Sequence, residues 1–283
     1  MKRWLKFVIL FILFIVGVFL YAKYIGTMGF ITKEYTIYDD NLPTSFDGLK
    51  VVHFSDLHYN RAINEDKVTD IINEINLLNP DVVVFTGDLI DKDVIINDDD
   101  YEFLTKLFSN INVKYGKYAI LGNHDYYNKE KIIKLFNDSN FKYLENEYDV
   151  VISKNNENIY IAGIGNLTHN LDVIDKALKD IKDDDLSYKV VLVHEPDISD
   201  DIINNYEVDL ILGGHSHNGQ VRLPVIGALY TPLGAKKYYD EYYKVNNTDI
   251  YISSGIGVSN VNVRLFNKPS INFYRINKRW IFN

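Results

Sequence analysis

Short apolar runs alternate with stretches of helical spacing through most of this chain, and that alternation restricts its fold more than any other feature. The runs "LKVVHFSD" and "PDVVVFTGD" have the length and the β-branched composition of buried strands. The apolar residues between them recur at the i, i+3, i+4, i+7 spacing of a helix with one apolar face: Val68, Ile71, Ile72, Ile75 and Leu78. The sequence therefore predicts a strand, a helix and a second strand over this region.

The same alternation continues toward the C-terminus and then changes. Further buried strands are predicted in "KYAILGNHD", "NIYIAGIG", "YKVVLVHEP" and "VDLILGGHSH". Beyond residue 219 the pattern becomes hairpin-like, with strands expected in "ALYTP", "KKYYDEYYKV", "DIYISSG" and "INFYRI". Alternating strands and helices followed by consecutive strands predict an α/β protein with mixed sheets.

The N-terminus differs in kind from the rest of the chain. Three basic residues among the first six precede an uninterrupted apolar run from Phe7 to Ala22. This run has nearly the length of about 20 residues that a membrane-spanning helix needs, and it also fits the core of a signal peptide. Because the small residues of a cleavage site are poorly placed, we predict a retained anchor over residues 1–31. The basic end would lie in the cytoplasm and the domain 32–283 outside the cell membrane.

Composition excludes some classes of partner and ligand. The formal net charge of −9 argues against a nucleic acid partner, because affinity for a polyanion depends on clustered Lys and Arg. The chain has no cysteine, so neither disulfides nor thiolate ligands are available. Any bound metal must take nitrogen and oxygen ligands.

Nearly every predicted strand ends in a polar cluster. These clusters are Asp56-Leu57-His58, Gly87-Asp88, Gly122-Asn123-His124-Asp125, His194-Glu195-Pro196 and Gly214-His215-Ser216-His217, and they hold five of the seven histidines. In α/β sheets, the loops that follow the carboxyl ends of strands converge on one edge, where ligands bind. His215 and His217 stand two positions apart, so an extended backbone would turn both imidazoles to one side. Carboxylates, imidazoles and an amide oxygen suit Mn, Fe or Zn without choosing among them.

The motifs also occur in an order that resembles the calcineurin-like metallophosphoesterase superfamily. The order is D-x-H, G-D-x-x-D, G-N-H-D, H-x-P and G-H-x-H, and the similarity runs from about Val51 to the C-terminal strands. The strings "FSDLH", "GNHDYY", "GHSHNGQVRLP" and "YISSGIG" further resemble the bacterial membrane-associated branch of that superfamily. The resemblance implies a four-layer α/β/β/α sandwich of two mixed sheets, with the membrane helix at its N-terminus.

The resemblance also implies a role for each strand-end residue. It implies two divalent metal ions and their ligands: Asp56, His58 and His217 for one ion, Asn123, His194 and His215 for the other, and Asp88 as the bridge. His124 matches the catalytic histidine of the family, which contacts the phosphate and can protonate the leaving oxygen. Asp91 would hold that imidazole in one tautomer. Asp125 closes the same motif, and we assign it no direct contact with metal.

These assignments predict an enzyme that hydrolyses phosphate esters by in-line attack of a metal-bound hydroxide. The site residues do not discriminate among phosphodiester, phosphomonoester and pyrophosphate, and the expected substrate is a phosphorylated small molecule or lipid precursor. The alternative is a catalytically silent metal-binding scaffold that holds a partner protein. The intact pair of His124 and Asp91 argues against that alternative, since a scaffold needs metal ligands but no proton donor.

Several other features favour ordinary structural roles. His53 is expected to be a hydrogen-bonded core histidine, and His169 a loop histidine rather than a substrate contact. The acidic runs Asp98–Asp100 and Asp183–Asp185 lack the alternating ligands of a calcium loop and are typical of helix starts or solvated loops. Packing on a strand surface is the expected role of four tyrosines: Tyr238, Tyr239, Tyr242 and Tyr243.

Overall fold

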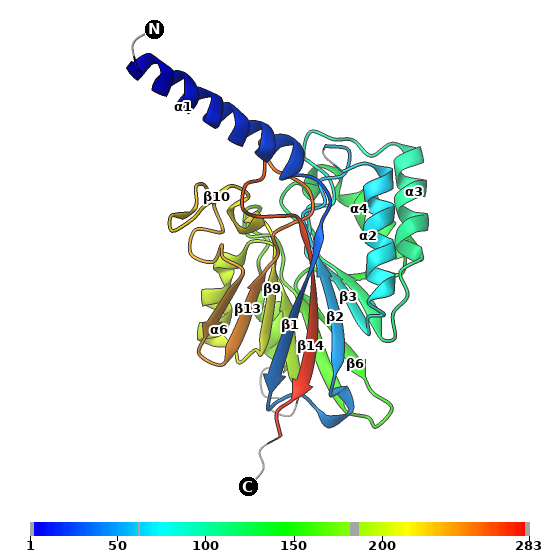
Figure 1. Ribbon diagram of the computed structural model, residues 1–283. Coiled ribbons are helices and arrows are strands. Elements are labelled where there is room, and N and C mark those ends of the chain that lie inside the picture. The colour runs from blue at the N-terminus through cyan, green and yellow to red at the C-terminus, as the bar shows by residue number, and fades with distance from the viewer. Residues whose placement is uncertain (1–2, 62, 182–186, 281–283) are drawn as a thin grey trace.

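Two six-stranded sheets face each other in the computed structural model, which describes residues 3–61, 63–181 and 187–280 (Figure 1). In order across the first sheet the strands are β1 Ile31–Asp39, β14 Ser270–Lys278, β2 Leu49–Phe54, β3 Val82–Phe85, β4 Gly116–Ala119 and β5 Phe141–Tyr143. In order across the second they are β12 Tyr242–Val245, β13 Thr248–Ile252, β9 Leu210–Gly213, β8 Tyr188–Leu192, β7 Asn158–Gly163 and β6 Glu147–Ile152. Each sheet contains both parallel and antiparallel pairs.

Helices cover the outer face of each sheet. On the first sheet lie α2 Glu65–Leu77, α3 Asp98–Ser109 and α4 Lys129–Asp138, and on the second lie α5 Ile174–Leu178 and α6 Ser199–Asn205. One buried apolar cluster fills each helix–sheet interface, and a third fills the space between the two sheets. The predicted four-layer α/β/β/α sandwich of two mixed sheets is confirmed.

The helices begin where the sequence provides caps. Asn64 accepts a hydrogen bond from the backbone of Lys67 at the start of α2, and the predicted apolar face of that helix is buried. Asn97 and Asp100 form a reciprocal capping box at the start of α3. The acidic run Asp98–Asp100 is therefore a helix start, as expected, while Asp183–Asp185 lies outside the described residues.

The C-terminal strands follow the predicted hairpin-like order in part, since β12 pairs antiparallel with β13 and β10 with β11, but the last strand departs from it. The last strand, β14, leaves the second sheet and inserts into the first, parallel to β1 and antiparallel to β2. The predicted strand "ALYTP" contributes only the short β11 Gly227–Ala228, which pairs with β10 Arg222–Leu223. Local strand propensity indicates extended backbone but not the partner with which the backbone pairs.

One helix stands apart from the sandwich. The helix α1, Arg3–Leu20, continues as a π-helical turn to Ile25, and within these 23 residues an 18-residue window has a mean hydropathy of 2.7 and is 6% buried. It is therefore long and apolar enough to cross a membrane. Its C-terminal end is tied to the body, because the backbone N–H of Arg264 donates to the carbonyl of Ala22 at 2.8 Å. At Gly26 an added Cβ would lie 1.9 Å from the Arg264 carbonyl oxygen, so only glycine permits this contact.

His53 on β2 is a core histidine, as the sequence predicts. Its side chain is fully buried, Nε2 lies 2.8 Å from Thr86 Oγ1, and burial lowers the pKa of the imidazole to about 3. The unfolded chain keeps an ordinary histidine pKa of about 6.5. Between those two values the unfolded state binds a proton that the folded state does not, so folded-state stability falls as pH decreases.

We expect His53→Gln to remove this part of the acid sensitivity. Above about pH 6.5 the difference in unfolding free energy between wild type and variant should be constant. Below this pH the unfolding free energy of wild type should fall by up to about 1.4 kcal/mol per pH unit more than that of the variant. Urea unfolding of both proteins across this range measures the effect. A difference that does not change with pH would show that His53 takes up its proton in the folded state.

Candidate metal centre

Loops from both sheets meet at the carboxyl ends of their central strands. They follow β2, β3, β4, β8 and β9, and they bring together every site residue that the sequence predicts: Asp56, His58, Asp88, Asp91, Asn123, His124, His194, His215 and His217. The expectation that the strand-end clusters share one edge therefore agrees with the structure. Their side chains form three overlapping groups of potential ligands: Asp56, His58 and His217; Asp88, His194 and His215; and His58, Asp91 and His124. The first two of these groups lie within the expected ligand sets.

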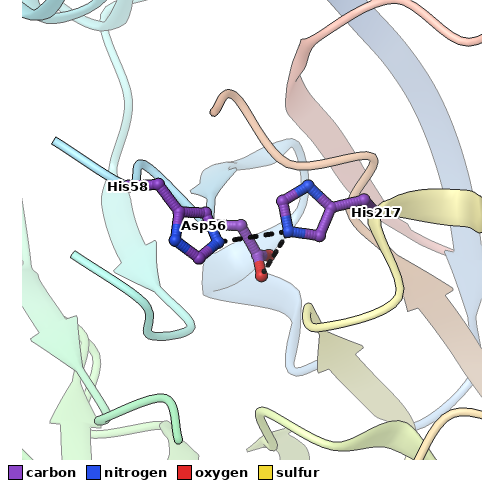
Figure 2. A group of neighbouring side chains, drawn as sticks. All are labelled: Asp56, His58 and His217. Carbon is purple, nitrogen blue, oxygen red and sulfur yellow. Dashed lines mark hydrogen bonds and ion pairs between the residues drawn. The ribbon is translucent and has the colours of Figure 1, made fainter. Parts of the chain in front are cut away.

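Asp56, His58 and His217 form the first group (Figure 2). His217 Nε2 lies 3.3 Å from Asp56 Oδ1 and 3.3 Å from His58 Nε2. Each of these residues is at most 3% exposed. A carboxylate and two imidazole nitrogens thus point at one small, buried volume.

Asp88, His194 and His215 form the second group. His194 Nε2 lies 3.3 Å from Asp88 Oδ2 and 3.2 Å from Asn123 Oδ1. The same Asp88 oxygen is 3.7 Å from His58 Nε2 in the first group. Asp88 therefore lies on the side of the second group that faces the first, and its Oδ2 atom is close to an imidazole of each group.

Hydrogen bonds on the far side of two imidazole rings determine which nitrogen faces the site. His194 Nδ1 donates to the carbonyl of Thr86 at 2.7 Å, and His215 Nε2 donates to the carbonyl of Leu233 at 2.8 Å. Because a carbonyl only accepts, each ring in its neutral form keeps its lone pair on the other nitrogen. His194 thus offers Nε2 to the site and His215 offers Nδ1.

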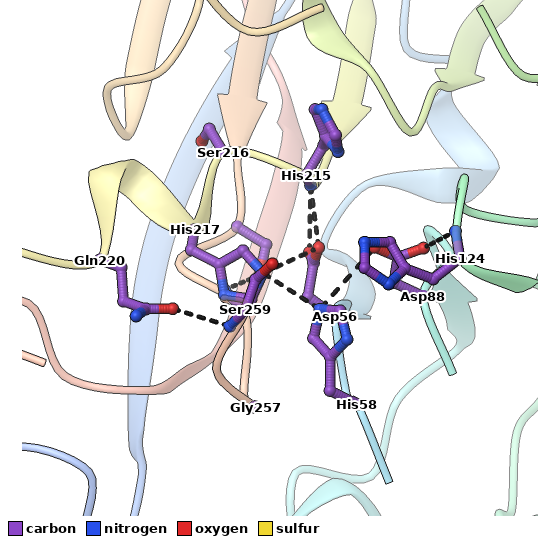
Figure 3. Close-up of polar contacts among 12 residues, drawn as sticks. Asp56, His58, Asp88, His124, His215, Ser216, His217, Gln220, Gly257 and Ser259 are labelled. Carbon is purple, nitrogen blue, oxygen red and sulfur yellow. Dashed lines mark hydrogen bonds and ion pairs between the residues drawn. The ribbon is translucent and has the colours of Figure 1, made fainter. Parts of the chain in front are cut away.

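His215 and His217 do not point the same way, so the expectation based on an extended backbone is wrong. The strand β9 ends at Gly213, and both histidines have left-handed backbone, with φ of 63° and 48°. The turn directs His217 toward Asp56 and His215 away from it (Figure 3). Asn218 follows with φ of 48°, a conformation that asparagine tolerates better than most residues.

This donor set fits divalent cations. The Nε2 atoms of His58 and His217 face each other beside buried carboxylates. A neutral imidazole carries only one proton, so these nitrogens and oxygens have more lone pairs than protons to place between them. Buried carboxylates without a compensating cation are costly. Imidazole, carboxylate and amide oxygen are ligands that suit Mn, Fe and Zn. The two groups are therefore suited to hold divalent metal ions.

His124 lies beside the groups, and contacts with Asp91 and Asp88 fix its position. Its Nδ1 is 3.0 Å from Asp91 Oδ1, and its backbone N–H donates to Asp88 at 2.9 Å. The other oxygen of Asp91 accepts from Arg61, whose guanidinium also donates to the carbonyl of Asn260 at 2.7 Å. With Nδ1 facing a carboxylate, Nε2 of His124 is available to a ligand.

Comparison with known proteins gives a consistent result. The family model of the calcineurin-like phosphoesterase matches residues 49–219. The chain is 32% identical over 261 residues to "Uncharacterized metallophosphoesterase YkuE" of Bacillus subtilis (strain 168), covering 90% of this chain and 88% of the relative. It is 29% identical to an "Uncharacterized metallophosphoesterase" of Helicobacter pylori (strain J99), covering 94% and 69%. The chain belongs to the calcineurin-like phosphoesterase family.

A vertebrate relative adds an observation about the membrane. The "Transmembrane protein with metallophosphoesterase domain" of Danio rerio is 28% identical over 247 residues, which cover 82% of this chain and 54% of that protein. Membership of the calcineurin-like phosphoesterase family, together with the His and Asp groups, supports a metal-dependent phosphoesterase. The apolar helix α1 supports association with a membrane.

The backbone around the expected ligands is strained. Left-handed φ values between 45° and 63° occur at five of the seven: Asp56, His58, Asp88, His215 and His217. Residues other than glycine avoid this region, and such strain persists only where the surroundings determine it. The loops must therefore be held by contacts outside the ligand set.

Asp125 supplies the main contacts of this kind. Its buried carboxylate accepts hydrogen bonds from the backbone N–H groups of Asp88 and Leu89 at 2.8 Å and of Gly122 at 2.9 Å. The two loops cross so closely that a Cβ on Gly122 would lie 2.1 Å from Asp88 Oδ1. Asp125 therefore supports the loop of Asp88 through its backbone, a role that the sequence did not predict.

Burial and neighbouring charge shift the pKa values of the site. Burial and the charge of Asp88 raise the pKa of Asp56 to about 6. Burial by itself would raise the pKa of Asp88 and lower that of His194. The attraction between the two charges outweighs burial, so the pKa of Asp88 is well below its usual range and that of His194 is well above it. Burial lowers the pKa of His58 to about 4. Without metal, the site therefore holds a proton on His194 at neutral pH.

Sequence reasoning missed two residues that support the site. Arg264 is fully buried, donates to the carbonyls of Ser254 at 2.8 Å and Gly257 at 2.6 Å, and lies 3.2 Å from His217 Nδ1. Gln220 accepts from the backbone of Ser259 at 2.9 Å and so joins two loops (Figure 3). A charged residue inside the apolar run "VNVRLF" was the only signal for Arg264.

The structural roles expected for His169 and the four tyrosines are borne out only in part, because Tyr242 and Tyr243 lie on β12 whereas Tyr238 and Tyr239 precede that strand. His169 Nε2 lies 3.1 Å from the carbonyl of Asn123, and its ring centroid is 4.4 Å from that of Tyr126. Tyr238 is buried against Tyr243, with ring centroids 5.0 Å apart. His169 therefore braces the loop that carries Asn123.

We expect Asp125→Asn to destabilise the protein and weaken metal binding together. The amide would turn an N–H group toward backbone donors and leave at least one of them unsatisfied, at a cost of about 1–3 kcal/mol in unfolding free energy. Urea unfolding and metal analysis measure the two effects. The exposed Asp93→Asn is the matched control and should change neither. An Asp125→Asn protein with wild-type stability would contradict this role.

We also expect metal binding to release protons at neutral pH. Coordination requires a neutral imidazole, so the proton that Asp88 holds on His194 must leave when metal binds. The apparent affinity should consequently fall as pH decreases. Calorimetric titration of the metal-free full chain with Mn²⁺, in two buffers of different ionisation enthalpy, measures the protons released. Equal heats in both buffers would contradict the raised pKa of His194.

Proposed function

We propose that this protein hydrolyses phosphate esters with two divalent ions, bound by the residues that the resemblance assigns. Asp56, His58 and His217 would hold one ion, while Asn123, His194 and His215 would hold the other, with Asp88 shared. The observation that carries the proposal is the position of His124. It stands beside both groups with Nδ1 on Asp91, and neither residue belongs to the two sets of expected ligands.

The side chains around the site have separable tasks in this reaction. When bound, the ions would polarise the phosphoryl group and lower the pKa of a water molecule. Nδ1 of His124 lies 3.0 Å from Asp91 Oδ1 and 3.2 Å from the backbone nitrogen of Lys92, so the ring is held on that side, and a proton on Nε2 would be donated to the leaving oxygen. Arg61 holds Asp91 in its charged form, since the guanidinium donates directly to the carboxylate. The ester would lie in the adjoining groove of about 480 Å³, lined by Asp88, His124 and apolar side chains.

We further propose that residues 1–31 anchor the domain 32–283 to the outer face of the cytoplasmic membrane. The length and exposure of α1 support the anchor, and the basic residues at its start favour a cytoplasmic N-terminus. The substrate would be a phosphorylated small molecule or lipid precursor. Protease treatment of intact cells tests the orientation, because a cytoplasmic domain would remain protected.

Substitutions at the site distinguish an enzyme from a scaffold. We expect Asp88→Asn to lose both bound metal and hydrolysis, because Asp88 contacts both groups. His124→Ala should keep its metal and lower the rate by about 10²- to 10⁴-fold, the usual effect of losing a proton donor. Asp91→Asn should lower the rate less, since the imidazole remains. Hydrolysis of bis(p-nitrophenyl) phosphate with added manganese measures the rates, and metal analysis of each variant accompanies it.

The exposed Asp93→Asn should keep wild-type rate and metal content. A metal-loaded wild type with no turnover on phosphodiesters, phosphomonoesters or pyrophosphates would favour the scaffold that holds a partner protein. Loss of metal in His124→Ala, or a full rate on a substrate with a poor leaving group, would contradict the role of His124.

A further inference from the structure

A short hairpin beside the metal centre exposes an unusual amount of apolar surface. The segment 223–233, "LPVIGALYTPL", contains no charged residue and includes Leu223 of β10, the turn that follows it and β11. Val225 and Ile226 at the tip are 108% and 70% exposed, and large apolar side chains continue along the segment at Leu229, Tyr230 and Leu233. A contiguous apolar protrusion of this kind marks a surface that contacts a partner.

The tip is also strained in a way that favours this exposure. Val225 has a φ of 71°, a left-handed conformation that is a genuine outlier for a β-branched residue. This backbone holds the valine side chain clear of the protein instead of packing it inward. Backbone strain of this kind clusters at functional sites.

The end of α1 identifies what the hairpin meets. Arg222 at the base of the hairpin lines the same cavity of about 580 Å³ as Tyr21 and Gly26 at the end of α1. In Figure 1 the loop that carries β10 lies at the edge of the body from which α1 extends. Because Ala22 and Gly26 fix the helix to the body through Arg264, the surface around this cavity must face the bilayer that α1 crosses.

Charge and aromatic residues around the hairpin match a lipid surface. Lys23 at the helix end is half-buried, and Lys236 beside the hairpin and Lys268 in the cavity wall are exposed. No carboxylate in the described parts of the chain forms an ion pair with them, since the two carboxylates of the cavity wall, Asp240 and Glu241, pair with Arg222 and Lys33. Exposed basic side chains attract anionic headgroups. Tyr24 and Tyr230 are also exposed, and tyrosine is enriched at the level of the headgroups.

We propose that the hairpin 223–233 is a second membrane contact, which inserts Val225 and Ile226 into the outer part of the bilayer that α1 crosses. This inference rests on the anchored location proposed above. Leu229 and Tyr230 of the same hairpin form a wall of the groove at the metal centre. The contact would therefore hold the groove at the bilayer surface, where an ester with a lipid-embedded substituent can enter it.

Labelling at single cysteines tests the proposal, because the natural chain has none. Three full-length variants, Ile226→Cys, Ile152→Cys and Phe11→Cys, would carry the environment-sensitive fluorophore NBD in vesicles of phosphatidylcholine and phosphatidylglycerol. Ile152 is the matched control, since it is 60% exposed at the end of β6 that pairs with Asn158, away from the site. Phe11 lies in α1 and reports whether the anchor is in the bilayer.

The three labels separate the possible outcomes. We expect blue-shifted emission and strong quenching by nitroxide-labelled lipids at positions 226 and 11, and neither effect at position 152. Quenching at 11 with a water-like label at 226 would overturn the hairpin contact while leaving the anchor intact. A label at 11 that lipids do not quench would show that the proposed anchor itself is wrong. A label at 226 that is shielded from water but not quenched by lipids would assign the hairpin to a protein partner and also overturn the proposal.

Hydrolysis of a soluble ester supplies an independent readout. We expect the double variant Val225→Ser, Ile226→Ser to keep its rate on bis(p-nitrophenyl) phosphate within about twofold, because neither side chain is a metal or proton-transfer group. Its rate on a phosphate ester embedded in the same vesicles should fall by roughly tenfold or more, mainly through KM, because two apolar insertions are lost. Equal rates of wild type and variant on the embedded ester would contradict the contact.

Discussion

The concentration of buried lone pairs at one sheet edge is the constraint on which the rest of the structure depends. Carboxylate and imidazole groups are unfavourable in a protein interior unless a proton or a cation lies between them. In the metal-free protein, a proton on His194 meets part of this need beside Asp88. Divalent cations would meet it more completely. The site is thus organised for cation binding by the same groups that would otherwise destabilise it.

Holding those groups together requires strained backbone, and the strain is stabilised from outside the ligand set. Asp88 has left-handed φ, yet its N–H and those of its neighbours are satisfied by Asp125. Asp125 in turn follows the expected ligand Asn123 on the next loop along the first sheet. One carboxylate therefore couples two ligand-bearing loops, and the sandwich beneath them fixes where these loops start.

The apolar helix α1 and the candidate metal centre share a connection through one residue. The backbone of Arg264 contacts Ala22 and Gly26 at the end of α1, while its buried guanidinium lies against His217 and the carbonyls of Ser254 and Gly257. Arg264 also lines the cavity whose wall includes Arg222, at the base of the 223–233 hairpin. Helix end, hairpin and expected ligand thus form one contiguous part of the molecule.

The sequence pattern by itself determined the order of strands and helices and the edge at which the site forms, while the family resemblance implied the four layers. Helical and strand periodicities reflect which face of each element is buried, and polar residues at strand ends must leave the core, so both are readable locally. The family resemblance added the roles of His124 and Asp91, which spacing alone does not indicate.

Only the tertiary structure decided which strands pair and which residues support the site. Neither the insertion of β14 between β1 and β2 nor the divergence of His215 and His217 follows from local pattern, because each depends on contacts between segments far apart in the chain. The support that Asp125 and Arg264 give to the site is likewise invisible in the sequence. A carboxylate or guanidinium reads as a surface charge until the fold surrounds it with backbone donors or acceptors.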